Sequence, residues 1–259
     1  MKHSWLLAAG LLLAAFPAHG EDPALAGALR SPARSPAFVA RDAMRHPAAE
    51  LAFFGLKPTQ TVVELLPGGG YWTEFLAPYL HDYGHYYVVS SGKSSEGVAA
   101  FQAKLAADPA WYGKITQTLL SDADIAPPHS VDLVLSFRSL HDWLRDGTAD
   151  QVLAKIHRAL KPGGVFGIED HRGQRQDPQD PKAADGYVRQ DYAIALIEKA
   201  GFKLVASSEM DANPRDTAHW PKGVWTLPPV LALGARDRAY YQSIGEADNF
   251  VLRFRKVGN

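Results

Sequence analysis

Three consecutive glycines, Gly68-Gly69-Gly70, directly follow a short apolar segment that carries one acid, Glu64. Glycine has no Cβ, so the backbone there can adopt left-handed conformations and lie very close to a ligand. A helix that begins just after the glycines would point unpaired backbone N–H groups at the same place. The stretch therefore predicts a nucleotide-type pocket early in a fold of alternating strands and helices.

His141 and Asp142 follow a second buried-strand pattern at 132–137. An imidazole has an ordinary pKa near 6.5, which suits proton transfer close to neutral pH. We expect His141 and Asp142 to act as catalytic residues that take a proton from a nucleophile. The alternative is that they only cap the loop and hold Trp143.

A third polar group, Asp170-His171-Arg172, follows the strand pattern at 165–169. It indicates either a polar substrate pocket or structural ion pairing. No His-x-His or His-x-x-x-His spacing accompanies it, so we predict no metal. The sequence also lacks a Gly-x-Ser-x-Gly elbow, which leaves Ser-His-Asp hydrolysis without support.

Composition excludes several other classes of protein. The chain has 259 residues and no cysteine, so disulfides, cysteine-ligated zinc and cysteine nucleophiles are excluded. Its formal net charge is −1, with charges dispersed along the chain. We therefore expect a small-molecule substrate, with no nucleic acid and no stable membrane insertion.

The N-terminus has the pattern of a secretory signal peptide. A short basic start precedes an apolar run at 5–16, and Ala18-His19-Gly20 is a small-x-small cleavage signal. We predict cleavage after Gly20 and a periplasmic location, with a retained N-terminal anchor as the alternative. Residues 21–36 are rich in Ala, Pro, Ser and Gly and are expected to form a flexible leader.

The remaining residues, 37–259, predict one domain. Strands are expected at 61–65, 85–90, 115–120, 132–137, 165–169, 203–207 and 250–255. Helices are expected at 38–54 with a break near His46-Pro47, at 71–80, at 98–107, from a capping box at 148–151 to Leu160, and at 189–200. Alternating strands and helices predict an α/β fold with a doubly wound, mostly parallel sheet and helices on both faces. Residues 210–249 are expected to cover the substrate side of that sheet or to pack on its edge.

Several stretches together resemble a known family. They are Val63–Tyr71, Phe137–Trp143 and Leu160–Gly164, with Arg41–Pro47 and Gly245–Phe250 in support. Over residues 37–256 the chain resembles class I S-adenosylmethionine-dependent methyltransferases, and within them an exported bacterial group described as predicted methyltransferases. The resemblance implies a Rossmann-like, seven-stranded sheet and S-adenosyl-L-methionine as cofactor.

The resemblance also assigns cofactor-binding residues. In the family, the glycine loop wraps the methionine part of the cofactor and an acid before it orients the loop. Carried over by position, the cofactor contacts are Glu64, Pro67, Gly68, Gly69, Gly70, Ser90, Asp122, Ala123 and Arg138. Leu66 stands where the family's first glycine is usual, and Ser90 stands where an acid normally binds both ribose hydroxyls.

Two functions follow from these observations, and a different enzymatic reaction on the same fold is a third option. The first is methyl transfer to an unidentified small or medium polar acceptor. The alternative is an exported binding or accessory protein on the same fold that has lost cofactor use, with Leu66 and Ser90 as marks of that loss.

Overall fold

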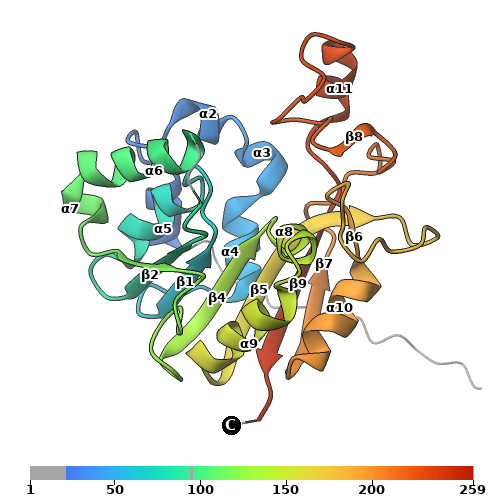
Figure 1. Ribbon diagram of the computed structural model, residues 1–259. Coiled ribbons are helices and arrows are strands. Elements are labelled where there is room, and N and C mark those ends of the chain that lie inside the picture. The colour runs from blue at the N-terminus through green and yellow to red at the C-terminus, as the bar shows by residue number, and fades with distance from the viewer. Residues whose placement is uncertain (1–21, 94–95, 259) are drawn as a thin grey trace, which may run out of the picture.

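A single central sheet organises the chain in the computed structural model, which describes residues 22–93 and 96–258 (Figure 1). Its strand order is β3-β2-β1-β4-β5-β9-β7. The strands are β1 (Thr61–Leu65), β2 (His85–Ser90), β3 (Thr116–Leu119), β4 (Val131–Phe137), β5 (Leu160–Gly173), β7 (Phe202–Ser208) and β9 (Asn249–Lys256). Strands β1 to β5 pair in parallel, and β9 is antiparallel to both of its neighbours. The predicted fold class is confirmed, and each of the seven predicted strands is present.

Two short strands lie outside this order. β6 (Val188–Arg189) pairs with the end of β5 and makes the sheet eight-stranded. β8 (Pro221–Val224) belongs to the segment between β7 and β9.

Helices cover both faces of the sheet, as Figure 1 shows. They are α1 (Pro23–Leu29), α2 (Pro36–Val39), α3 (Asp42–Arg45), α4 (Pro47–Phe54), α5 (Thr73–Leu80), α6 (Glu96–Ala107), α7 (Pro109–Tyr112), α8 (Leu140–Arg145), α9 (Ala149–Ala159), α10 (Gln190–Lys199) and α11 (Arg238–Ile244). Helices α1, α4, α5 and α6 bury side chains against one face, while α8, α9 and α10 do so against the other. Among the described residues, no helix has the length and apolarity that a membrane crossing needs.

β4 shows why continuous apolar segments form the centre of this sheet. Leu133 and Leu135 belong to the core on the α5 face, and Val134 belongs to the core on the α9 face. Successive side chains of a strand point to opposite faces, so a strand covered on both sides must be apolar at nearly every position.

The expectation of a flexible leader over 21–36 is wrong for the part of it that the structure describes, residues 22–36. The Asp22 side chain accepts hydrogen bonds from the backbone N of Ala24 and Leu25, so it caps α1. Tyr79 on α5 donates its hydroxyl to the same carboxylate, and Leu25 is buried. A capping acid followed by Pro23 was a helix-start signal that the loop-like composition concealed. The predicted signal peptide, residues 1–20, lies outside the described residues.

The predicted capping box at 148–151 is also wrong, although α9 begins where it was expected. The Thr148 side chain makes no cap to the helix. Its hydroxyl instead donates to the backbone carbonyl of Trp143 at 3.4 Å. The tight turn between α8 and α9 brings that carbonyl close, and it competes successfully for the hydroxyl.

Residues 210–249 form a separate small core beyond the carboxyl ends of the parallel strands, where Figure 1 shows β8 and α11 standing. Its buried members from this segment are Ala218, Val224, Leu227, Leu231, Tyr241, Ile244 and Ala247. Tyr187 joins them from outside the segment. Asp216 connects the two parts, because its carboxylate accepts hydrogen bonds from the Tyr187 hydroxyl and the Trp220 indole. The segment is thereby anchored over the edge of the sheet where ligands bind in α/β folds.

Candidate active site

A cavity of about 780 Å³ opens at the carboxyl ends of β1, β2 and β4. Seven of the predicted site residues line it: Glu64, Pro67, Gly68, Gly69, Ser90, Arg138 and Asp142. Four others do not: Gly70, Asp122, Ala123 and His141. Pro229 and Val230 of the segment 210–249 form part of its wall.

The glycine loop after β1 takes the left-handed conformations that its sequence predicted. Gly68 and Gly70 have φ angles of 58° and 86°. A Cβ at Gly68 would meet nothing within 4 Å, so this glycine leaves cavity space that a side chain would take. A Cβ at Gly70 would lie 2.6 Å from Cδ2 of Phe101, so Gly70 allows α6 to pack against the loop. Its role in the described structure is therefore packing and not a cavity wall.

Leu66, at the usual position of a glycine, also has a left-handed φ of 51°. The loop therefore keeps the backbone path that glycine normally provides, despite the Cβ strain. Leu66 and Tyr71 line the cavity and leave it open. The Tyr71 hydroxyl donates to Asp42 Oδ1 at 2.7 Å, which holds its ring in the wall.

Glu64 lies beneath the loop at the end of β1 and is only 1% exposed. Thr73, the first residue of α5, donates its hydroxyl to Glu64 Oε2 at 2.6 Å, and Tyr86 donates to the same oxygen. Burial raises the pKa of Glu64 to about 7, against the two hydrogen bonds that lower it. Because Glu64 connects β1, β2 and the start of α5, it holds the two ends of the glycine loop in position.

Ser90 ends β2 and lines the main cavity, whereas Asp122 and Ala123, which the family resemblance assigned to the cofactor, do not. The Asp122 carboxylate accepts the backbone N–H of Leu119 at 2.8 Å and faces a smaller hollow of about 340 Å³. The Ala123 carbonyl accepts from Arg158. Ser121, one residue earlier, lines the main cavity in their place. The prediction therefore identified the correct turn, but the side chain that lines the cavity belongs to the residue before the predicted pair.

Three arginines, Arg41, Arg45 and Arg138, line the cavity at the end near Tyr71 and share one carboxylate, that of Glu246. The contacts are 2.7 Å from Arg41 Nε, 3.0 Å from Arg45 Nε and 3.0 Å from Arg138 Nη1. Glu169 lies 3.7 Å from Arg138, but burial raises its pKa to about 8, so at neutral pH it is mostly uncharged. This end of the cavity is therefore positively charged and suits an anionic group.

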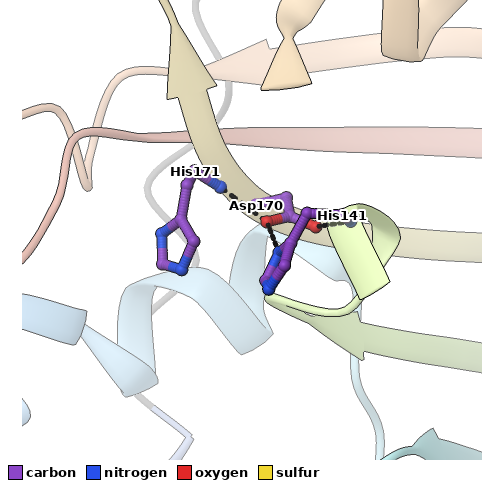
Figure 2. Close-up of side chains that lie close together, drawn as sticks. All are labelled: His141, Asp170 and His171. Carbon is purple, nitrogen blue, oxygen red and sulfur yellow. Dashed lines mark hydrogen bonds and ion pairs between the residues drawn. The ribbon is translucent and has the colours of Figure 1, made fainter. Parts of the chain in front are cut away.

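His141 lies at the start of α8 and is only 5% exposed (Figure 2). Its Nδ1 is 2.8 Å from Asp170 Oδ1, and its backbone N donates to Asp170 Oδ2 at 3.1 Å. Burial disfavours the charged imidazole, but the Asp170 carboxylate outweighs this and raises the pKa of His141 above 6.5. The other ring nitrogen, Nε2, lies 3.6 Å from Asp142 Oδ1, and Asp142 lines the cavity.

His171 lies beside His141, with ring centroids 5.2 Å apart. Its Nδ1 faces the Asn249 side-chain oxygen at 2.8 Å, and burial lowers its pKa to about 3, so the ring is neutral. Atoms of His141, Asp170 and His171 that can bind metals all lie within 4.8 Å of one another. Asp170 is buried, His171 is half-buried, and neither lines the cavity. Of the two uses predicted for this polar group, the contacts between Asp170 and the histidines agree with structural pairing and not with a substrate pocket.

The comparisons with known proteins agree with this geometry. Residues 63–168, which run from β1 to β5, match the family described as a methyltransferase domain. This stretch of the chain is therefore similar to a methyltransferase domain. The match contains the glycine loop and strands β2 to β4 in full, and parts of β1 and β5.

Three similar proteins extend the comparison. A sterol 24-C-methyltransferase of Gibberella zeae is 27% identical over 145 residues, which are 51% of this chain and 34% of that protein. The chain thus spans about a third of that relative's length. A methyltransferase of Aquifex aeolicus aligns over 91% of this chain and 99% of its own, with 17% identity and a TM-score of 0.58. A 1,6-didemethyltoxoflavin-N1-methyltransferase of Burkholderia thailandensis, with its substrate and S-adenosylhomocysteine bound, aligns over 86% and 82%, with 18% identity and a TM-score of 0.53. The two solved structures show a shared fold.

Proposed function

We propose that this protein transfers a methyl group from S-adenosyl-L-methionine to a small or medium polar acceptor. The observation that carries the proposal is the open cavity at Gly68, which is lined by bare loop backbone and by three arginines. The structural relative from Burkholderia thailandensis, which holds S-adenosylhomocysteine and a small substrate, supports the choice of ligand.

The cavity residues fit the parts of this cofactor. Gly68 and Gly69 would hold its methionine part, with Arg41, Arg45 and Arg138 as the cationic partners for its carboxylate. Ser90, at the end of β2, would donate or accept one hydrogen bond to a ribose hydroxyl. When bound, the cofactor supplies an electrophilic methyl group on a sulfonium.

The acceptor's side of the cavity is formed by Asp142, with His141 behind it. A neutral hydroxyl or amine that gains a methyl group develops positive charge, which the Asp142 carboxylate stabilises. The proton that the acceptor then loses goes to Asp142 and on to Nε2 of His141, 3.6 Å away. A shift of about 0.5 Å brings these two atoms within hydrogen-bond distance.

Calorimetric titration with S-adenosylmethionine and S-adenosylhomocysteine tests the proposal. Wild type should bind both in the micromolar range, and Gly68→Arg should abolish binding because the new side chain fills the cavity. Gly163→Arg is the matched control, since Gly163 also has a positive φ and open space around it but does not line the cavity. Absence of heat with wild type at millimolar ligand would instead favour the exported accessory protein.

We also propose that the protein is exported, with residues 1–20 removed as a signal peptide. The support is the basic start, the apolar run and the Ala18-His19-Gly20 motif. Mass spectrometry of the N-terminus after cell fractionation tests this. A periplasmic chain that starts at Glu21 is expected, and a soluble cytosolic chain with an intact Met1 would contradict it.

A further inference from the structure

Asp170 is fully buried at the carboxyl end of β5, yet none of the proposed cofactor or acceptor contacts uses it. Figure 2 shows it between the two histidines, joined by hydrogen bonds to both. We propose that Asp170 is a positioning residue for methyl transfer, which keeps a proton on Nδ1 of His141 and leaves Nε2 free to receive one from the acceptor. This inference rests on the proposed function.

The contacts of Asp170 hold its carboxylate in one orientation. Its Oδ1 accepts from His141 Nδ1 at 2.8 Å and from the backbone N of His171 at 2.7 Å. Its Oδ2 accepts the backbone N of His141 at 3.1 Å. Because the same carboxylate binds both the ring and the backbone of His141, it determines which way the imidazole points as well as which nitrogen carries the proton.

Nε2 of His141 points to the cavity side of this arrangement. It lies 3.6 Å from Asp142 Oδ1, and Asp142 lines the cavity where the acceptor would bind. In the reaction, the acceptor's lone pair forms the new bond to the methyl carbon, and the electrons of the broken C–S bond stay on sulfur. The acceptor's proton leaves through Asp142 to Nε2, and Asp170 stabilises the imidazolium that results.

Four charged or titratable side chains face His141, and their signs favour this proton acceptor. Asp170 and Asp142 stabilise its charged form, and Arg145 opposes it from the next turn of α8. His171 is the fourth, and its burial keeps it neutral. Two carboxylates against one guanidinium leave a net negative surrounding that attracts the proton.

The same three residues, His141, Asp170 and His171, are spaced closely enough to bind a metal ion, which is the alternative role for Asp170. Asp170 already accepts three hydrogen bonds and is 0% exposed. Nδ1 of His171 is engaged by Asn249. A metal ion bound to the Asp170 carboxylate would displace hydrogen bonds that hold α8 to β5. A role for His141 as proton acceptor keeps all three of these hydrogen bonds.

Nitrogen-15 NMR of the histidine rings in the full chain tests the inference without an acceptor. In wild type, neutral His141 should carry its proton on Nδ1 and have a pKa above 6.5. Asp170→Asn should raise its acid dissociation constant roughly tenfold or more, because the carboxylate charge is lost. Asp177→Asn is the matched control: it removes a carboxylate from another histidine, His219, at the surface and should leave His141 unchanged.

Three outcomes would overturn the inference. They are a proton on Nε2 of neutral His141 in wild type, an unchanged titration in a folded Asp170→Asn, and stoichiometric Zn²⁺ binding that shifts both His141 and His171. The wild-type measurement decides even if Asp170→Asn does not fold. Calorimetry with S-adenosylhomocysteine on the same samples separates this inference from the proposed function, because cofactor binding does not depend on the state of His141.

Discussion

Gly68 and Gly70 occupy the same loop, share left-handed backbone angles, and differ in what a methyl group would meet. An alanine in that conformation costs about 1–2 kcal/mol at either position, because its Cβ approaches the following carbonyl. At Gly70 the added Cβ would also lie 2.6 Å from the buried ring of Phe101, and such overpacking typically costs about 1–3 kcal/mol more. We therefore expect Gly70→Ala to lower the free energy of unfolding by about 2–5 kcal/mol, and Gly68→Ala by about 1–2 kcal/mol.

Urea unfolding followed by tryptophan fluorescence measures both values, with Gly163→Ala as the control for backbone strain alone. Gly163 has a φ of 74°, and nothing lies within 4 Å of its added Cβ. In the ligand assay, Gly68→Ala should weaken S-adenosylhomocysteine binding roughly tenfold, while Gly163→Ala leaves it unchanged. The reasoning would be refuted if Gly70→Ala were no less stable than Gly163→Ala, or if Gly68→Ala bound the ligand as tightly as wild type.

Three further predictions concern other parts of the molecule. Ser90→Asp should tighten S-adenosylhomocysteine binding roughly tenfold in calorimetry, because a charge-assisted hydrogen bond to the ribose replaces a neutral one. An unchanged affinity would contradict the placement of the ribose at Ser90. Burial raises the pKa of Glu169 in the folded state from 4.5 to about 8, so between these pH values the native state holds a proton that the unfolded chain releases. The contribution of Glu169 to the free energy of unfolding therefore falls as the pH rises from 4.5 to about 8. Glu169→Gln should accordingly show a flatter dependence of unfolding free energy on pH between 5 and 9 than wild type, and parallel curves would exclude this origin. Tyr79→Phe removes the hydroxyl that donates to Asp22, and it should lower the free energy of unfolding in urea by about 1 kcal/mol. Proteolysis near α1 should also be faster. Equal digestion rates would show that α1 docks without this hydrogen bond.

Sequence patterns predicted the helices and strands well wherever burial alone determines which residue types an element can contain. β4 is apolar on both faces, so its sequence indicates a central parallel strand without knowledge of its neighbours. The reverse holds at Thr148, because a capping residue can have more than one possible partner. Its hydroxyl takes the carbonyl of Trp143, which the turn between α8 and α9 brings close, in place of a helix N–H.

The candidate site divides in the same way. Glu64 and Gly68 lie within one short stretch of chain, and a motif can indicate both. The Arg41–Glu246 pair spans 205 residues and the His141–Asp170 pair spans 29. No periodicity connects such residues. The family resemblance placed a cofactor contact at Asp122, but Ser121, one residue earlier, lines the cavity.

The amino-acid sequence by itself determined the order of strands and helices, the glycine loop and the type of fold, because each depends on residues within a few positions of one another. Only the tertiary structure decided that one glycine of the loop keeps space for a ligand while another keeps space for Phe101. It also decided that a buried aspartate holds His141 and that three arginines share Glu246. These pairings form between residues that are far apart in the sequence, because the sheet brings the ends of separate strands together at one edge. A local sequence pattern therefore cannot indicate them.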